Sequence, residues 1–468
     1  MRRPLTIGLV LVLLGLVGAP GALADPVAFR WSVPAKLAGD GVDGVARKVD
    51  EATLRTTEIE VRTCAPDPSW SLDGAPVTPT PAGRCRARLD LGDDQEHTLV
   101  LRSEGEEASA TVRARDLLVV TVGDSVSSGE GNPDGPSVLS PRWLERRCHR
   151  SMRSGAAQAA LALESGSTRS AVTLLALGCS GATVPRGLLG SYAGIEPDAR
   201  RGPLPAQLDE VARLASRRMP DAVLVSIGAN DVNFGAVARF CVVVARCPER
   251  RFDPARSGGV AKDPAAPTAA EVQASAIAGL PERYAQVAAR LRDARVPADR
   301  VVLVEYFDPT HDEEGEVCAQ ALPGIDRDEA AWAFSSVVVP LNAQARLAAL
   351  RHGWRFVRGV QDAFLAHGIC ARGHDRWVRR IEESLGRGSG LSGPLHPNGL
   401  GHLATAALIG PVLADATGVS GGTDVAQAAG RPDDEGSRVA WWWLVVTALA
   451  GALAGGGLAI LAARRRRP

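Results

Sequence analysis

The chain has 468 residues, of which 45% are hydrophobic and 23% are charged. Its 53 Lys and Arg residues balance its 53 Asp and Glu residues, so the formal net charge is zero. Nucleic-acid binding proteins carry a basic patch or stripe, and the sequence shows none, so we expect no nucleic-acid partner.

The chain opens with the pattern of a secretory signal peptide. Two arginines at positions 2 and 3 precede a mostly apolar run from 5 to 17, and Ala22-Leu23-Ala24 supplies small residues for cleavage. We therefore expect residues 1–24 to be removed and the mature chain to begin near Asp25. The expected location of the mature protein is outside the cytoplasm.

The cysteine count fits an oxidising location. Eight cysteines, an even number in a secreted chain, favour disulfides over free thiols or a metal cluster. We expect no metal and no cofactor. If each cysteine pairs with its neighbour along the chain, the disulfides are Cys64–Cys85, Cys148–Cys179, Cys241–Cys247 and Cys318–Cys370. Other pairings remain open.

Residues 25–115 are expected to form a small β-rich module. Polar and apolar residues alternate over 58–62, 86–91 and 97–101, and Pro, Gly and Asp interrupt these runs. Such alternation predicts an antiparallel, sandwich-like module. A glycan-binding role, a spacer role and packing against the next domain remain open, since Trp31 and Trp70 offer only weak support for sugar stacking.

Residues 116–417 are expected to form the catalytic domain, with apolar strands alternating with helical stretches. This alternation predicts a mainly parallel, five-stranded sheet with helices on both faces, which is an α/β fold. The Pro-, Ala- and Gly-rich stretch 252–267 is expected to be a surface insertion that shapes the substrate pocket. The predicted strands cover 117–122, 171–177, 222–227, 301–305 and 354–357, and the predicted helices cover 154–164, 205–217, 281–294, 328–350 and 400–416.

Four short segments lie at the boundaries of these elements. They are Gly123-Asp124-Ser125, Gly178-Cys179-Ser180-Gly181, Gly228-Ala229-Asn230-Asp231 and His396-Pro397-Asn398. The first puts a hydroxyl at the carboxyl end of a buried strand, where open α/β sheets bind ligands. A serine needs a base to become a nucleophile, and His396 is the best candidate. Each segment alone is more typical of a turn or a helix cap, but the four together favour a catalytic site.

The order of these segments and the residues in them resemble the motifs of the SGNH hydrolases, or GDSL esterase/lipase family. The resemblance covers about 117–416. The resemblance implies a three-layer α/β/α fold, with Ser125 as nucleophile and His396 as base. It further implies that the oxyanion accepts hydrogen bonds from the N–H groups of Ser125 and Gly181 and from the Asn230 amide. Such donors lower the barrier by about 3–4 kcal/mol each. A Cys148–Cys179 disulfide also fits the secreted bacterial esterases of the family.

One position departs from the family pattern. Many members carry an aspartate three residues before the histidine, where this chain has Gly393. The resemblance to the secreted esterases implies that the main-chain carbonyl of Gly393 orients His396 instead. A carboxylate from elsewhere, such as Asp362 or Asp375, is the alternative.

Other polar residues near predicted strand ends are given structural roles. Asp124, Asp231 and His402 are expected to support the local fold rather than to react. A polar cluster after the fourth strand fits neither a zinc nor a calcium motif, so we expect it to form a solvated loop. This cluster comprises Asp308, His311, Asp312, Glu313 and Glu314.

The end of the chain predicts a membrane anchor. An apolar stretch from 439 to 463 is long enough to cross a bilayer, with tryptophans at 441–443 and arginines at 464–467. Tryptophans favour the lipid interface and arginines the cytoplasmic side, so residues 464–468 are expected to be a cytoplasmic tail. The stretch 418–438 is expected to be a flexible tether.

The sequence thus predicts a membrane-tethered extracellular serine esterase or lipase. Its expected partners are an ester substrate, either a lipid or an acylated glycan, and the membrane, and the protein is expected to be a monomer. Two alternatives stay open: an acyltransferase acting on a cell-wall polymer or glycolipid, and an inactive surface binding module.

Overall fold

The computed structural model describes residues 27–37, 45–46, 48–135, 141–256, 258–386 and 392–419. The expected signal peptide, all but the first two residues of the expected tether, the expected bilayer-spanning stretch and the basic tail lie outside the described residues.

The first part of the described chain forms two four-stranded antiparallel sheets. One sheet has the order β1 (Arg30–Ser32), β3 (Glu58–Arg62), β7 (Arg86–Asp90), β6 (Thr80–Gly83), and the other has the order β5 (Ala75–Val77), β4 (Ser69–Leu72), β8 (His97–Ser103), β9 (Glu106–Val112). Their inward side chains share one core, including Ile59 and Leu89 from the first sheet and Leu99 and Leu101 from the second. The module is therefore a small β-sandwich, as the alternation predicts.

The central sheet of the following domain has six parallel strands rather than the five predicted. Its order is β16 (Arg355–Val357), β13 (Val301–Val304), β12 (Ala222–Ser226), β10 (Arg115–Gly123), β11 (Ser170–Ala176), β2 (Val45–Ala46). The five predicted strands are present. The sixth, β2, contributes only two residues from a segment before the domain, which is too short to give a periodic signal.

Strand β10 shows why the sheet is buried on both faces. Leu117 and Val119 belong to the core on one side of the sheet, and Leu118 and Val120 belong to the core on the other. Successive side chains of a strand point to opposite faces, so only a continuous apolar run can serve both cores.

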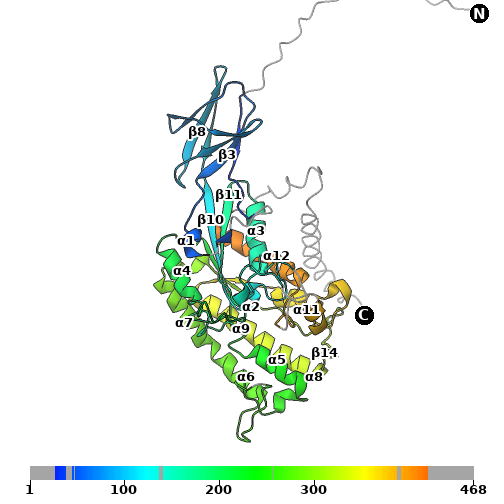
Figure 1. Ribbon diagram of the computed structural model, residues 1–468. Coiled ribbons are helices and arrows are strands. Elements are labelled where there is room, and N and C mark those ends of the chain that lie inside the picture. The colour runs from blue at the N-terminus through cyan, green and yellow to red at the C-terminus, as the bar shows by residue number, and fades with distance from the viewer. Residues whose placement is uncertain are drawn as a thin grey trace, which may run out of the picture.

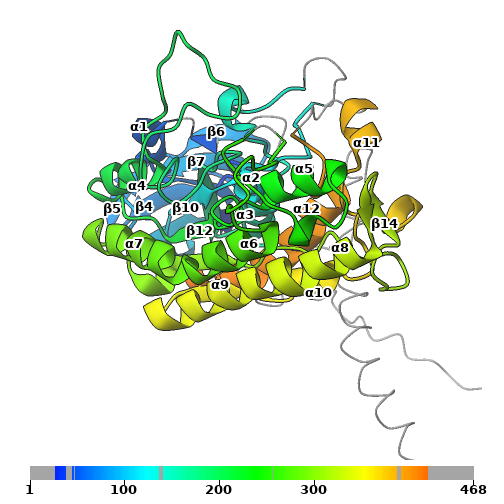
Figure 2. The same cartoon turned by 90° about the horizontal axis from the view of Figure 1, so that it is seen from below.

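Helices cover the two faces of this sheet, giving a three-layer fold (Figures 1 and 2). On one face lie α3 (Gly155–Ser165) and α12 (Gly399–Thr417), and on the other lie α1 (Val49–Ala52), α4 (Gln207–Ala215), α7 (Leu280–Asp293) and α9 (Val339–His352). The α/β/α architecture expected from the sequence is thereby confirmed.

Among the described residues, α12 is the one helix long and apolar enough to cross a membrane. It packs against α3 and along strands β12, β13 and β16, and Ala406, Ile409 and Leu413 are buried in the core. Since these contacts are made within the domain, α12 is the closing helix of the α/β fold. Any membrane anchor has to come from another part of the chain.

The predicted helix over 328–350 is two helices in the structure. It is divided into α8 (Arg327–Ala333), a π-helical turn (Phe334–Val338) and α9. Pro340 occupies the start of α9 and lacks the N–H that an uninterrupted α-helix requires there.

Several further elements gather at the carboxyl end of the sheet, which faces the viewer in Figure 2. The segment 252–267 is only partly a surface insertion, because Phe252 is buried and its ring lies 4.9 Å from that of Phe240. The further elements are α2 (Ser125–Ser128), α5 (Phe234–Val243), α6 (Ala269–Ala278), the hairpin β14 (Gln320–Leu322) and β15 (Ile325–Asp326), α10 (Val360–Phe364), α11 (Ile381–Gly386), and 3-10 turns at Arg146–Cys148, Cys247–Glu249 and Gly373–Asp375. A further 3-10 turn, Ala298–Arg300, leads into the amino end of β13.

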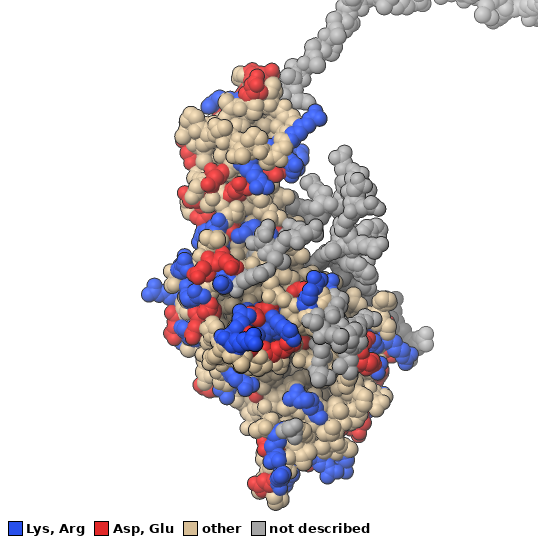
Figure 3. All heavy atoms as spheres, in the orientation of Figure 1, with Lys and Arg blue, Asp and Glu red and all other residues tan. Residues whose placement is uncertain are grey.

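The sandwich lies at the amino ends of the parallel strands. Strand β9 leads within a few residues into the start of β10, whereas Ser125 follows the far end of that strand. Figure 1 shows the sandwich and α2 at opposite ends of β10. On the face drawn in Figure 3, acidic and basic side chains are interspersed, which agrees with the zero net charge.

Four disulfides are present, and they join the pairs that sequence neighbourhood predicts. Cys64–Cys85 joins the ends of neighbouring strands β3 and β7 in the sandwich. Cys148–Cys179, Cys241–Cys247 and Cys318–Cys370 fasten loops and helices around the carboxyl end of the sheet.

Gly123 is expected to contribute strongly to stability. It has φ of +134°, and a Cβ built there would lie 1.9 Å from the Ser226 carbonyl oxygen. Gly123→Ala should therefore cost about 3 kcal/mol or more in the free energy of unfolding. The matched control is Gly74→Ala, where φ is +83° and nothing lies within 4 Å, so a cost of about 1–2 kcal/mol is expected. Urea unfolding with the disulfides intact would compare them, and equal losses would contradict the argument.

Candidate active site

Ser125 lies where the central strand stops. β10 ends at Gly123, and the Asp124 carboxylate caps α2 by accepting a hydrogen bond from the Val126 N–H at 3.1 Å. The Ser125 carbonyl accepts from the N–H groups of Gly129 and Glu130, at 3.1 and 3.0 Å. This tight turn fixes the backbone of a serine that is only 8% exposed.

The segment containing Gly181 lies directly against this turn. The Cys179 N–H donates to the Gly123 carbonyl at 3.0 Å, which extends the strand pairing beyond β11. Gly181 has φ of +80°, and a Cβ there would lie 2.6 Å from the Tyr192 hydroxyl. A larger residue at this position would therefore be strained in its backbone and would crowd the Tyr192 side chain.

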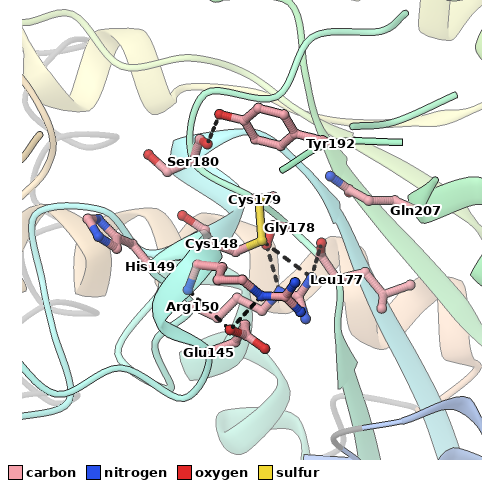
Figure 4. The surroundings of a disulfide bond; sticks show 12 residues. Glu145, Cys148, His149, Arg150, Leu177, Gly178, Cys179, Ser180, Tyr192 and Gln207 are labelled. Carbon is pink, nitrogen blue, oxygen red and sulfur yellow. Dashed lines mark hydrogen bonds and ion pairs between the residues drawn. A yellow bond between two sulfur atoms is a disulfide. The ribbon is translucent and has the colours of Figure 1, made fainter. Parts of the chain in front are cut away.

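The disulfide Cys148–Cys179 joins this segment to the loop before α3 (Figure 4). Beneath it, the buried Arg150 guanidinium donates to the carbonyls of Leu177 and Gly178 at 3.0 and 2.9 Å. Burial lowers the pKa of Arg150 to about 10, so it remains a cation at neutral pH. The disulfide and the cation together hold the backbone just before Gly181.

Asn230 reaches the same place from the end of β12. Its Nδ2 donates to the Ala182 carbonyl at 3.0 Å, which leaves the second amide proton for another acceptor. The next residue, Asp231, accepts hydrogen bonds from the Val184 N–H at 3.0 and 3.1 Å. Burial raises the pKa of Asp231 to about 6. These contacts lock the second and third segments together.

The orientation of His396 is set by main-chain carbonyls. Its Nδ1 lies 3.1 Å from the Pro394 carbonyl oxygen, and its backbone N–H donates to the Gly393 carbonyl at 3.2 Å. Nδ1 thus hydrogen-bonds directly to the Pro394 carbonyl, a partner that the sequence did not predict. The Gly393 carbonyl, which was predicted to orient the ring, accepts from the backbone N–H of His396. Because a carbonyl only accepts, Nδ1 carries the proton in the neutral ring and Nε2 carries the lone pair.

No carboxylate among the described residues hydrogen-bonds to the His396 ring. The alternatives Asp362 and Asp375 are both exposed and make no such contact. Burial lowers the pKa of His396 below its usual value, while the Glu130 charge and the carbonyls of Pro394, Ser392 and Gly393 act in the opposite direction. The lowered pKa favours the neutral imidazole, which is the form that a general base requires.

The histidine loop packs onto the nucleophile loop at Gly131. A Cβ at this position would lie 2.5 Å from the Pro397 carbonyl oxygen and 3.0 Å from the His396 Cβ. Arg379 fastens the contact, because its Nε donates to the Gly131 carbonyl at 2.7 Å and its backbone N–H donates to the His396 carbonyl at 2.8 Å. The first and last segments, far apart in sequence, therefore meet.

Glu130 is the buried centre of these loops. One carboxylate oxygen lies 2.7 Å from both the His149 Nδ1 and the Ser180 hydroxyl, and the Glu130 carbonyl lies 3.1 Å from the His402 Nε2. Its other carboxylate oxygen, Oε1, is buried and has no hydrogen-bond partner among the described residues. Sequence reasoning missed this residue, since a lone Glu in a Gly-rich loop carries no specific signal.

The pKa values of His149 and His402 are shifted in opposite directions. Burial alone would lower the pKa of His149, but the carboxylates of Glu130 and Glu196 on its two nitrogens raise it. Burial lowers the pKa of His402 to about 4. The neutral His402 accepts from the Gly155 N–H at 3.1 Å and donates to Glu130, which agrees with the structural role expected for it.

Tyr306 joins the first segment to the third. Its hydroxyl donates to the Asp124 carboxylate and accepts from the Ala229 N–H at 3.2 Å. Burial raises the pKa of Asp124 to about 7, although the Tyr306 hydroxyl and the Val126 N–H favour its charged form. Sequence patterns carry no signal for Tyr306, because its partners follow the ends of other strands.

The polar cluster after β13 is not the solvated loop that was expected. Asp308 is 0% and His311 is 6% exposed, and the two side chains are hydrogen-bonded to each other. Thr310 also donates to Asp308 at 2.7 Å, and the His311 ring packs edge-on against Phe334. The prediction was therefore wrong for Asp308 and His311, whereas Asp312 and Glu313 are half-buried and Glu314 is exposed.

The fold and the meeting of these four segments define an α/β/α hydrolase-type site at the carboxyl end of a parallel sheet. The chain belongs to the GDSL-like Lipase/Acylhydrolase family, whose model matches residues 121–404. The match spans all four segments, from β10 to α12.

Solved structures of esterases and lipases are similar to the chain at low sequence identity. A phospholipase A1 from Streptomyces albidoflavus NA297 is 17% identical, over 64% of this chain and 98% of that one, with a TM-score of 0.36. A carbohydrate acetylesterase family member from Sinorhizobium meliloti is 14% identical, over 65% and 100%, with a TM-score of 0.32. An acetylxylan esterase from Geobacillus stearothermophilus, in a catalytic mutant form, is 15% identical, over 66% and 97%, with a TM-score of 0.30. No curated protein sequence matches the chain.

Glu130→Gln should alter the pH dependence of turnover. The Glu130 charge favours the protonated form of His396, so its loss should move the acid limb of the pH–rate profile to lower pH. We expect kcat to fall by roughly 10-fold or more, because the charge also stabilises the imidazolium formed during reaction. Glu196→Gln is the matched control, since Glu196 contacts the other nitrogen of the same His149. Identical profiles for the two variants would contradict a specific effect of Glu130.

Asp124→Asn should flatten the pH dependence of stability. The pKa of Asp124 is about 7 in the fold against an ordinary value of 3.8, so its contribution is fully present below pH 4 and is lost as the pH rises through 7. Between pH 5 and 8 the wild type should therefore lose on the order of a few kcal/mol of unfolding free energy relative to Asp124→Asn. Urea unfolding across this range would measure the difference, and parallel curves would refute it.

Proposed function

We propose that the protein is a serine esterase or lipase that hydrolyses carboxylic esters through an acyl-enzyme on Ser125. The observation that carries this proposal is the convergence of four segments, spread over more than half of the described chain, on one strand end. Ser125, Gly181, Asn230 and His396 are contributed by separate elements, and their backbones are held together by direct hydrogen bonds and packing.

In the first half-reaction, the Ser125 Oγ attacks the ester carbonyl carbon and its proton passes to Nε2 of His396. The charge that develops on the carbonyl oxygen is met by the N–H groups of Ser125 and Gly181 and by the Asn230 amide. The tetrahedral intermediate then collapses. The carbon–oxygen bond to the alcohol breaks, and the alcohol leaves with the proton from His396.

In the second half-reaction, water takes the place of the alcohol. His396 removes its proton, the hydroxide attacks the acyl-enzyme, and the acid is released as the Ser125 Oγ regains the proton. The hydrogen bond from Nδ1 to Pro394 keeps the same ring nitrogen facing the reaction in both halves. The buried Glu130 carboxylate supplies the negative charge that an aspartate at position 393 would otherwise provide.

We further propose that the catalytic domain is extracellular and tethered to the cell membrane. The disulfides support an oxidising location, and the apolar stretch 439–463 with its flanking tryptophans and arginines supports a single span with a cytoplasmic tail. In this arrangement residues 418–438 give the site a limited reach above the bilayer.

Substitution of the proposed residues should separate their roles. Ser125→Ala and His396→Ala should each lower kcat by several orders of magnitude, while Asn230→Ala should lower it by roughly 10²–10³-fold. The assay is hydrolysis of p-nitrophenyl esters from acetate to palmitate by the full chain in mild detergent. Full activity of the Ser125→Ala protein would refute the mechanism.

Product analysis distinguishes hydrolysis from acyl transfer at the same site. With a cell-wall polymer or glycolipid present as acceptor, a hydrolase should release mainly free acid. Acylated acceptor in excess of free acid would assign the protein to the acyltransferases instead. Failure of an organophosphonate to label Ser125 would point to an inactive binding module.

A further inference from the structure

A cavity lined almost entirely by apolar side chains lies beside the candidate active site. It is enclosed by α5, α6, α8, the π turn and the β14–β15 hairpin. Two of its lining residues adjoin proposed catalytic residues: Leu395 precedes His396, and Phe234 begins α5 just after the segment that contains Asn230. The stretch 252–267, expected to shape a pocket, does not itself line this cavity.

The size and lining of the cavity suit a short hydrocarbon chain. Its volume is about 50 Å³, whereas a single water requires roughly 10–15 Å³ on the same measure. Val237, Leu322, Ala330 and Ile369 are among the side chains that form its walls. Apolar pockets with one or two placed polar groups are typical of sites that recognise small organic ligands.

The polar group in this cavity is Gln273. It lies on α6, is 1% exposed, and neither its amide nitrogen nor its amide oxygen has a hydrogen-bond partner among the described residues. The other polar side chains of the lining are paired, since Glu329 accepts from the Cys247 N–H at 2.9 Å and Thr310 donates to Asp308. A buried amide without partners is costly, and it becomes favourable when an occupant supplies a donor and an acceptor.

We infer that this cavity receives the acyl group of the ester, and that its preferred acyl group is short and carries a hydroxyl along the chain. A hydroxyl can donate a hydrogen bond to the Gln273 amide oxygen and accept one from the amide nitrogen, so a single group can satisfy both atoms. The inference rests on the proposed function and names its substrate class: esters of short hydroxy acids. A site that hydrogen-bonds a substrate hydroxyl discriminates strongly against the analogue that lacks it.

The test compares ethyl hexanoate with ethyl 3-hydroxyhexanoate and ethyl 6-hydroxyhexanoate, using the full chain and acid titration. The wild type should show kcat/KM at least roughly 10-fold higher for one of the hydroxylated esters. Gln273→Leu, which keeps the volume and removes the amide, should abolish or reverse this preference. Gln286→Leu on α7 is the matched control, because Gln286 is not among the residues that line the cavity, and it should keep the wild-type ratio.

The possible outcomes separate the inference from the proposed function. No hydrolysis of any ester by the wild type would refute the proposed function. Hydrolysis without preference for either hydroxylated ester, or a preference that survives Gln273→Leu, would overturn the inference alone. If Gln273→Leu does not fold, Gln273→Met makes the same comparison, and the wild-type ratio remains decisive.

Discussion

The burial of one carboxylate, Glu130, is the constraint on which the candidate site depends. A charged group without solvent must be matched by donors, and Glu130 finds them in His149 and Ser180, while its carbonyl contacts His402. These partners come from the disulfide loop, the segment of Gly181 and the closing helix. The carboxylate and the carbonyl of this one residue therefore bring three separate parts of the chain together around the loop that follows Ser125.

Strand geometry explains why the site lies where it does. The parallel strands end together, so loops that are far apart in sequence meet at one edge of the sheet. Gly123 allows β10 to approach β12 so closely that the Ser226 carbonyl occupies the place of a side chain. The sandwich lies at the opposite end of the sheet from these loops.

The histidine illustrates how main-chain groups replace a missing carboxylate. A carbonyl fixes the tautomer as an aspartate would, but it brings no full charge to stabilise the imidazolium. In the proposed mechanism Glu130 supplies charge through space from the neighbouring loop, and Arg379 holds the two loops in contact. In this arrangement the main-chain carbonyl orients the His396 ring and Glu130 provides the negative charge, whereas a single aspartate often does both.

The sequence by itself determined the layers, the five main strands, the disulfide pairs and the four segments, because these depend on periodicity, spacing and local residue type. It did not reveal β2, the buried Asp308–His311 pair, or the roles of Pro394, Tyr306 and Glu130. Each of these depends on a partner that is distant in the chain or on a main-chain direction that side-chain identity does not encode. Only the tertiary structure places Gln273 in an apolar cavity, since the surrounding walls come from elements that are separated in the chain by up to about 160 residues, from Phe234 to Leu395.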